Sequence, residues 1–300
     1  MKCFSPYVRR FAGYALPFFI PCGQCPACRY NSARDWSFRI QQESTDFKVD
    51  EIFFVTLTYD SDSVPVDYSL VPSHLSDWLK RVRKRLSYPI RFFACGEYGD
   101  RLGRPHYHAI LFGLKKDDIV SLGISKTDWL KGIRPAVSGS GYDVAWSKGF
   151  VEIEAPRSVD SVSSYIASYV TKKLRVKEYH SRFPPFHRQS LGLGKNLIDK
   201  LPFYTPIVNF NGYARSIGKY LRRKLAEKFN VLDVVVKQGK DYLNSLTEDI
   251  LHSVDYTGYV SPPKNAVPFH LEKFAYQRYY SGVFALQEAK LKLSKIRMDL

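Results

Sequence analysis

Residues 90–113 contain two apolar stretches separated by a short turn, and this pattern constrains the fold more than any other part of the chain. The stretches "IRFFACGEYG" (90–99) and "RPHYHAILFG" (104–113) are rich in aromatic and aliphatic residues, and "DRLGR" forms part of the turn between them. Strands joined by so short a connection pair antiparallel, because a parallel pair needs a long crossover. The segment therefore predicts a β-hairpin within an antiparallel sheet.

Further strands and helices surround this hairpin. The segments 51–59 ("EIFFVTLTY") and 150–154 ("FVEIE") have the composition of strands. The segments 73–86 and 158–174 carry apolar residues at helical spacing. The order strand, helix, strand, strand, strand, helix predicts an α+β fold in which helices cover one face of an antiparallel sheet.

The chain is predicted to have three parts. Residues 1–45 form an N-terminal segment that contains cysteines, and residues 46–185 form the α+β core. Residues 186–300 form a basic accessory region, which is mainly helical because 214–229 and 285–298 show helical spacing.

The charge of the chain favours a polyanionic partner. Lys and Arg number 45 against 29 Asp and Glu, which gives a net charge of +16. Contacts to phosphates release counterions, so nucleic acid is the favoured partner class, with an ordinary basic protein as the alternative. The basic faces of 80–85 and 215–228 are candidates for backbone contacts, with a solvated charged surface as the alternative. No apolar run is long enough to span a membrane, so no membrane partner is expected.

The cysteines predict a metal site in place of a disulfide framework. Five cysteines is an odd number, and three of them form the pattern C-x₂-C-x₂-C at Cys22, Cys25 and Cys28. Cys3 would complete a structural zinc site with four thiolates, and free thiols near a turn are the alternative. This usage fits a reducing cytoplasm.

Two histidines in the second stretch of the hairpin are candidate metal ligands. Alternate side chains of a strand share a face, so His106 and His108 point one way and Tyr107 the other. Glu97, nine residues upstream across the turn, offers a third ligand. Two imidazoles and one carboxylate leave positions open for water and substrate. A pair of structural histidines that have found hydrogen-bond partners is the alternative.

Two tyrosines in the predicted helix 158–174 are candidate nucleophiles. Tyr165 and Tyr169 are four residues apart and share a stripe with Lys172 at the edge of the apolar face. A phenol with a pKa of about 10 needs a metal-polarised phosphate or a nearby base in order to attack at neutral pH. On spacing alone, an ordinary pair of tyrosines bordering a core is the alternative.

Three stretches of the chain together resemble a known family. "FVTLTY" (54–59), "RPHYHAILFG" (104–113) and "YIASYVTKK" (165–173) are similar to the three ordered motifs of the HUH endonucleases that initiate rolling-circle replication. Within that group, "PCGQCPAC" (21–28) and "GEYG…RPHYH" (96–108) resemble the replication initiation proteins of microviruses of the gokushovirus branch.

The resemblance implies a ferredoxin-like HUH core and a metal-dependent nickase and ligase. His106, His108 and Glu97 would hold Mg²⁺ or Mn²⁺, and Tyr165 and Tyr169 would be the nucleophiles. One tyrosine would attack single-stranded or melted origin DNA, remain joined to the 5′ phosphate and free a 3′ hydroxyl for a host polymerase. Lys172 would contact a phosphate oxygen or the phenolate.

The resemblance also bears on partners and on rival functions. The chain has no Walker-type phosphate-binding motif, so no nucleotide cofactor is expected and a host helicase would unwind the DNA in the bacterial cytoplasm. A tyrosine transposase or a relaxase of the same superfamily would use the same chemistry. A non-catalytic, zinc-dependent nucleic-acid-binding protein is the rival from another class.

Overall fold

The computed structural model describes residues 1–99, 102–118, 145–155, 181–260 and 269–298. The chain divides into two compact units, and the division falls inside helix α1 (Pro26–Ser44). The sheet unit is Ala33–Pro202, and the helical unit combines Met1–Ser32 with Phe203–Leu300. These bounds differ from those of the three predicted segments, whose functional division stays a prediction.

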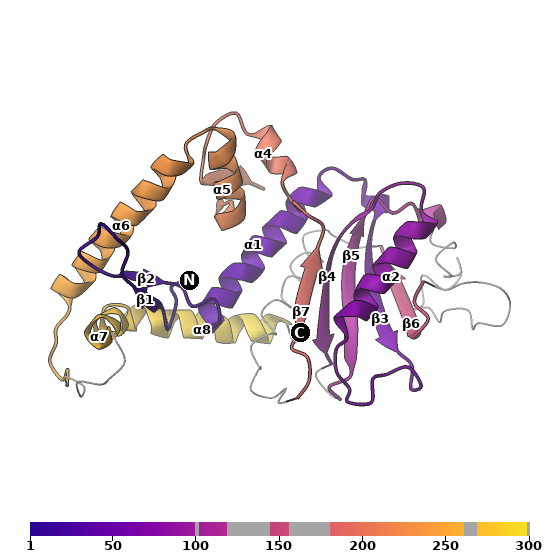
Figure 1. The fold of residues 1–300 in the computed structure, drawn as a ribbon, viewed down its shortest axis with the longest axis horizontal. Helices are drawn as coiled ribbons and strands as arrows, with labels where there is room; N and C mark the ends of the chain where they lie inside the picture. The colour runs from indigo at the N-terminus through magenta and orange to yellow at the C-terminus, as the bar shows by residue number, and fades with distance from the viewer. Residues whose placement is uncertain (100–101, 119–144, 156–180, 261–268, 299–300) are drawn as a thin grey trace. The chain divides into compact units, whose positions relative to one another are not determined.

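The sheet unit is built on a five-stranded antiparallel sheet with the strand order β6-β3-β5-β4-β7 (Figure 1). Its strands are β3 (Ile52–Tyr59), β4 (Arg91–Tyr98), β5 (Pro105–Phe112), β6 (Gly149–Glu154) and β7 (Phe186–Gln189). The predicted hairpin is confirmed, because β4 and β5 pair antiparallel with Glu97 opposite His106. Strand β7 was not predicted, since its four residues, "FHRQ", show no apolar alternation.

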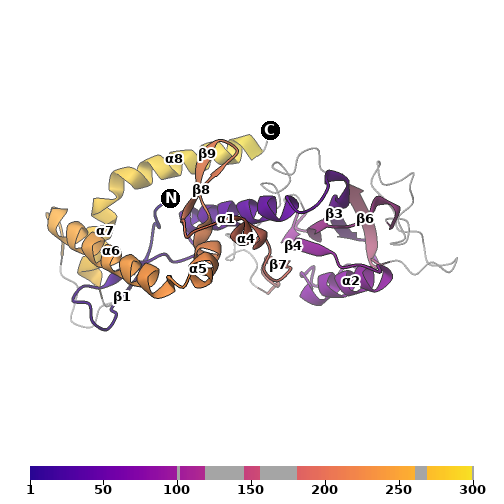
Figure 2. The same cartoon turned by 90° about the horizontal axis from the view of Figure 1, so that it is seen from above.

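Helix α2 (Pro72–Arg85) covers one face of this sheet, as Figure 2 shows. Proline at the first helical position and basic residues in the last turn are favourable at these two ends. The apolar side of α2 packs on the residues of β5 that alternate with the histidines. The buried residues of α2 are Leu75, Trp78, Leu79 and Val82.

The opposite face of the sheet is also covered. Ile40 and Trp36 of α1 pack there against Phe93, Ile110 and neighbouring apolar residues. β4 and β5 are apolar on both faces, and such strands require cover on both sides. The α+β class is therefore confirmed, and the structure differs from the predicted single covered face. The unit also contains the short helices η1 (Val49–Glu51) and α4 (Asn196–Lys200).

The helical unit brings the beginning and the end of the chain into one core. Val8 and Phe19 of a short N-terminal hairpin pack against Ile250, Tyr276 and Phe284 of the C-terminal helices. The elements of the unit, besides the first turns of α1, are β1 (Tyr7–Arg9), β2 (Phe18–Ile20), β8 (Ile207–Phe210), β9 (Tyr213–Ser216), α5 (Gly218–Lys228), α6 (Leu232–Ser253), α7 (His270–Tyr279) and α8 (Ser281–Met298).

The mainly helical character of the C-terminal region is confirmed. Helix α8 contains the predicted stretch 285–298, whereas the beginning of the stretch 214–229 forms strand β9 before α5 starts. Across the parts of the chain that the structure describes, no helix has both the length and the apolar character needed to cross a bilayer.

A buried hydroxyl network ties β5 to the loop before α2. The Tyr107 hydroxyl lies 2.7 Å from the Tyr59 hydroxyl, accepts a hydrogen bond from the backbone N–H of Val71 (3.0 Å) and lies 3.0 Å from the carbonyl oxygen of the same residue. The Tyr59 hydroxyl also lies 2.7 Å from Nδ1 of His74. Burial raises the pKa of both phenols, so they stay protonated at neutral pH.

We expect Tyr107→Phe to lower the free energy of unfolding of the sheet unit by about 1–3 kcal/mol, because it leaves buried partners unsatisfied. Urea denaturation followed by tryptophan fluorescence measures this, since all four tryptophans of the chain lie between residues 33 and 202. Tyr213→Phe, at a side chain that is 78% exposed, is the matched control and should leave stability unchanged. Equal stability of the two variants would contradict the structural role of the network.

Candidate metal centre

Strand pairing gathers the three predicted ligands on one face of the sheet. His106 lies opposite Glu97 of β4, and His108 lies opposite Cys95 of β4 and Thr56 of β3. Directly paired residues of antiparallel strands point to the same face, and residues two apart on one strand do so as well. One ligand atom from each of Glu97, His106 and His108 therefore lies within 4.8 Å of the other two.

The distances within this group fit a single ion. Oε1 of Glu97 lies 2.8 Å from Nε2 of His106 and 3.3 Å from Nε2 of His108. A divalent ion with ligand bonds of about 2.1 Å places adjacent corners of its octahedron about 3.0 Å apart. The same two nitrogens and one oxygen also suit a four-coordinate ion with slightly wider angles.

The orientation of His106 points its lone pair at the carboxylate. Nδ1 of His106 donates a hydrogen bond to the carbonyl oxygen of Arg104 over 3.1 Å, because that oxygen can only accept. In the neutral ring, Nε2 then presents a lone pair toward the lone pairs of Glu97. A cation, either a proton or a metal ion, is needed between such groups, and this arrangement is typical of metal-ligating histidines.

His108 is oriented by two residues of β3. The hydroxyl Oγ1 of Thr56 lies 3.0 Å from its Nδ1, which leaves Nε2 directed toward Glu97. The ring of Phe54 stacks on the imidazole with the centroids 5.4 Å apart and the planes at 17°. These contacts fix the ring in the position that a ligand must hold before the ion arrives.

The site is nearly enclosed on the side of Glu97. Glu97 is 3% exposed and His108 is 6% exposed, whereas the side chain of His106 is 18% exposed. A carboxylate this deeply buried costs free energy unless a positive charge balances it. The burial pattern therefore favours a cation beside Glu97, reached from the side of His106.

Two neighbours of the site were not predicted. Thr56 was detectable in principle, because the alternation of "FVTLTY" and an antiparallel pairing with β5 place it beside a histidine. His187 of β7 lies opposite Cys95 on the same face, where it stacks on Phe93 and meets the edge of Trp36. The four-residue strand that carries His187 has no pattern from which this position follows.

Gly96 allows the strand that carries Glu97 to accept its neighbour β7. A Cβ atom at this position would lie 2.7 Å from Cε1 of Phe186, which is closer than real carbon atoms approach. The ring of Phe186 packs on the core under α2, on the face away from the histidines. The "CGE" sequence thus combines a buried thiol, a space for an aromatic ring and a ligand in three successive residues.

Tyr165, Tyr169 and Lys172 lie outside the described residues, together with the predicted helix 158–174 that contains them. Their roles and their distance from Glu97, His106 and His108 stay predictions.

The basic residues of α2 do not line this site, because α2 covers the other face of the sheet. Nε of Arg81 donates a hydrogen bond to the carbonyl oxygen of Ala145 over 2.8 Å, and the guanidinium of Arg83 lies over the ring of Phe92. These two side chains therefore contribute to packing within the sheet unit, and contact with DNA by the basic face of α2 stays a prediction.

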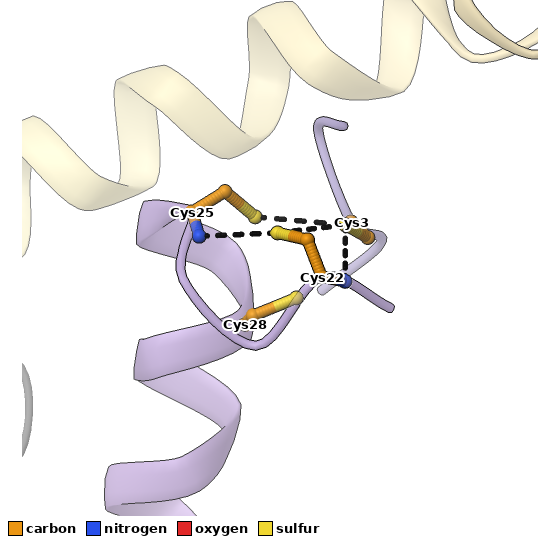
Figure 3. Close-up of side chains that lie close together, drawn as sticks. All are labelled: Cys3, Cys22, Cys25 and Cys28. Atoms are coloured by element: carbon orange, nitrogen blue, oxygen red, sulfur yellow. Dashed lines mark hydrogen bonds between the residues drawn. The ribbon is translucent and has the colours of Figure 1, made fainter. Parts of the chain in front are cut away.

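The four predicted cysteines form a second cluster, in the helical unit (Figure 3). Burial raises the pKa of Cys3 to about 11 and also raises that of Cys28. Burial acts in the same direction on Cys22, but hydrogen bonds from the backbone N–H groups of Cys25 and Gln24 outweigh it and lower its pKa to about 7. Cys22 is therefore the thiol of these three that ionises most readily.

Comparisons with known proteins agree with the motifs. Residues 52–174 match the family of the replication-associated protein ORF2. The chain is 29% identical to the replication-associated protein VP4 of Bdellovibrio phage phiMH2K over 276 residues, which cover 82% of this chain and 83% of that protein. It is 31% identical over 185 residues to the replication-associated protein ORF2 of Spiroplasma virus 4, with 58% of this chain and 55% of that protein covered.

A third relative is the replication-associated protein ORF4 of Chlamydia phage 1, with 27% identity over 260 residues that cover 80% of this chain and 61% of that protein. No solved structure matches the chain. The resemblance to viral replication-associated proteins that the motifs predict is confirmed. The matched residues 52–174 begin with β3 and include Glu97, His106 and His108.

Proposed function

We propose that this chain, a relative of viral replication-associated proteins, initiates replication by nicking one strand of single-stranded or locally melted origin DNA. The observation that supports this most directly is the convergence of Glu97, His106 and His108 on one face of the sheet, inside the segment that matches the family. Two imidazoles and a buried carboxylate form a donor set suited to a divalent cation beside a phosphate.

The proposed chemistry is a transesterification with a tyrosine as the nucleophile. The hydroxyl oxygen of Tyr165 or Tyr169 forms a bond to the phosphorus and loses its proton. The bond from phosphorus to the 3′ oxygen breaks, and that oxygen takes up a proton. The products are a 5′-phosphotyrosine and a free 3′ hydroxyl. Attack of a 3′ hydroxyl on the phosphotyrosine reverses the step, so the strand is rejoined without ATP.

The residues that we describe have definite tasks in this scheme. Glu97, His106 and His108 would hold Mg²⁺ or Mn²⁺, which polarises the scissile phosphate when it is bound. The Arg104 carbonyl and the Thr56 hydroxyl keep both Nε2 atoms directed at Glu97. Lys172 would contact a phosphate oxygen or the phenolate, and the +16 charge of the chain would supply affinity for the DNA backbone.

The proposal includes host partners and has two rivals. A host polymerase would extend the 3′ hydroxyl in the bacterial cytoplasm, and a host helicase would separate the strands. A transposase or relaxase would form the same covalent bond on other DNA, so the sequence that is cut separates these two from an initiator. A non-catalytic zinc-dependent nucleic-acid-binding protein would form no covalent bond at all.

The experiment that tests the proposal looks for the covalent intermediate. The full chain is incubated with Mn²⁺ or Mg²⁺ and with 3′-labelled single strands that tile the DNA of its replicon, and the products are separated under denaturing conditions. We expect labelled DNA to migrate with the protein for strands that contain the origin, and EDTA to prevent this. Absence of the adduct on every strand with both metals would overturn the proposal.

A 5′ label on the same strand provides the internal check. It should appear on a shorter fragment that is free of protein and that a polymerase can extend from its 3′ hydroxyl. A fragment that carries a 3′ phosphate, or an adduct that retains the 5′ label, would contradict the proposed polarity.

A further inference from the structure

The cysteine cluster lies apart from the proposed nuclease chemistry, and its geometry is that of a ligand shell. The sulfur atoms of Cys3, Cys22, Cys25 and Cys28 all lie within 4.8 Å of one another. Sγ of Cys3 is 3.5 Å from that of Cys22 and 3.7 Å from that of Cys25. Four sulfurs bonded to one ion at about 2.3 Å are separated by about 3.8 Å at tetrahedral angles. Sulfurs joined in a disulfide lie about 2.05 Å apart.

Backbone N–H groups are directed at these sulfurs. Sγ of Cys22 accepts hydrogen bonds from the backbone of Gln24 (3.4 Å) and of Cys25 (3.3 Å). Sγ of Cys25 accepts one from Phe4 (3.4 Å), and Sγ of Cys3 accepts one from Cys22 (3.3 Å), as Figure 3 shows for the bonds between cysteines. Donors of this kind favour thiolate over thiol, and thiolates are the form in which cysteines bind a metal.

The backbone between the ligands is shaped for this arrangement. Gly23 has a φ of +73°, so the chain turns sharply after Cys22 and returns its N–H groups to that sulfur. Cys28 is in the first turn of α1, and the half-buried Arg29 next to it interacts electrostatically with Cys22 and Cys25. A cationic side chain offsets part of the negative charge that four thiolates retain around a divalent ion.

We propose that Cys3, Cys22, Cys25 and Cys28 bind one structural Zn²⁺ ion. Four thiolates in a closed tetrahedral shell are the donor set of structural zinc, and the shell leaves no open position for a substrate. The close approach of the sulfurs fits one ion and is too tight for a cluster of several iron atoms with their bridging sulfides. The inference does not depend on the proposed nicking activity.

The ion fastens the N-terminal residues to the C-terminal helices. The residues on either side of Cys3 contact α7 and α8: the carbonyl of Lys2 accepts a hydrogen bond from Nε2 of Gln287 (3.1 Å), and the ring of Phe4 packs edge-on against Phe284. Cys22, Cys25 and Cys28 hold the other side of the shell at the beginning of α1. Zinc would therefore contribute to the folding free energy of the helical unit, as structural zinc does in other small modules.

Metal analysis of the purified full chain tests the inference. We expect one zinc ion per chain that a thiol-modifying mercurial releases. We also expect that replacement by Co²⁺ gives the thiolate-to-cobalt charge-transfer absorption of a four-cysteine site. Cys25→Ser should lose this absorption and the bound zinc. Cys95→Ala, a buried cysteine outside the cluster, is the matched control and should keep both.

Hydrogen exchange separates this role from the proposed catalytic one. Zinc removal from the wild-type chain should reduce amide protection in residues 1–32 and 203–298 and leave the strands of the sheet unit protected. Wild-type chain without zinc, with cysteine pairs oxidised to disulfides, would overturn the inference. Charge-transfer absorption retained in Cys25→Ser would overturn it too. A failure of DNA nicking would leave this result unaffected, because the readouts are the metal and the thiolates.

Discussion

The Tyr165→Phe/Tyr169→Phe double variant is expected to form no covalent adduct with DNA. Phenylalanine lacks the oxygen that would bond to phosphorus, so the proposed step has no nucleophile. Loss of a nucleophile lowers enzymatic rates by about 10⁴–10⁶-fold, which places the residual reaction below detection on a denaturing gel. DNA binding should persist, since two hydroxyl groups contribute little to the affinity that a charge of +16 supplies.

A matched double variant controls for the loss of tyrosines in general. Tyr213 and Tyr242 are 78% and 61% exposed, and both belong to the helical unit. Their replacement by phenylalanine should leave adduct formation unchanged. At least one of the single variants Tyr165→Phe and Tyr169→Phe should still form an adduct. An undiminished adduct in the Tyr165→Phe/Tyr169→Phe variant would remove both residues from the mechanism.

The His106→Ala variant is expected to lose cleavage while it retains most of its DNA binding. The change removes one of three ligands, and its partner carboxylate is almost fully buried. Changes in the hydrogen-bond partners of metal ligands alone cost about 10–100-fold, so loss of a ligand should lower the cleavage rate by at least about 10²-fold. Glu97→Gln should have a similar effect, because an amide is neutral and binds a divalent ion more weakly.

Two measurements on each variant decide the role of the pair. Fluorescence anisotropy with an origin strand reports binding, and the denaturing gel reports cleavage. His252→Ala, at an exposed position in α6, is the control and should change neither. A collapse of binding in a folded His106→Ala protein would assign the histidines to DNA recognition. Cleavage that persists in both His106→Ala and Glu97→Gln would exclude the metal centre from the reaction.

The sequence was sufficient for the features that depend on local patterns. Alternation in 104–113 placed His106 and His108 on one face, and the short turn placed Glu97 on the neighbouring strand. The spacing of the cysteines identified the four that the structure brings together. In each case, the residues are near one another in the sequence or belong to a short motif, so few folds can separate them.

Features that depend on distant pairing were missed. β7 joins the sheet 88 residues after β4 ends, and its sequence is too short and polar to indicate a strand. The cover that α1 gives to the histidine face was missed because a helical pattern does not specify which surface it packs on. The start of 214–229 was predicted as helix, but pairing with β8 makes it a strand. Tertiary contacts override local preference at such places.

Strand β5 carries two different requirements on its two faces. His106 and His108 face the proposed metal centre, whereas Tyr107 and Leu111 face the core under α2. Selection on this one strand is therefore divided by residue parity: changes at one set of positions remove activity from an abundant protein, and changes at the other set reduce abundance itself. A lineage that lost the reaction would be free to vary at positions 106 and 108 while 107 and 111 stayed fixed. The alternation of the strand thus separates the evolutionary record of catalysis from that of folding within eight residues.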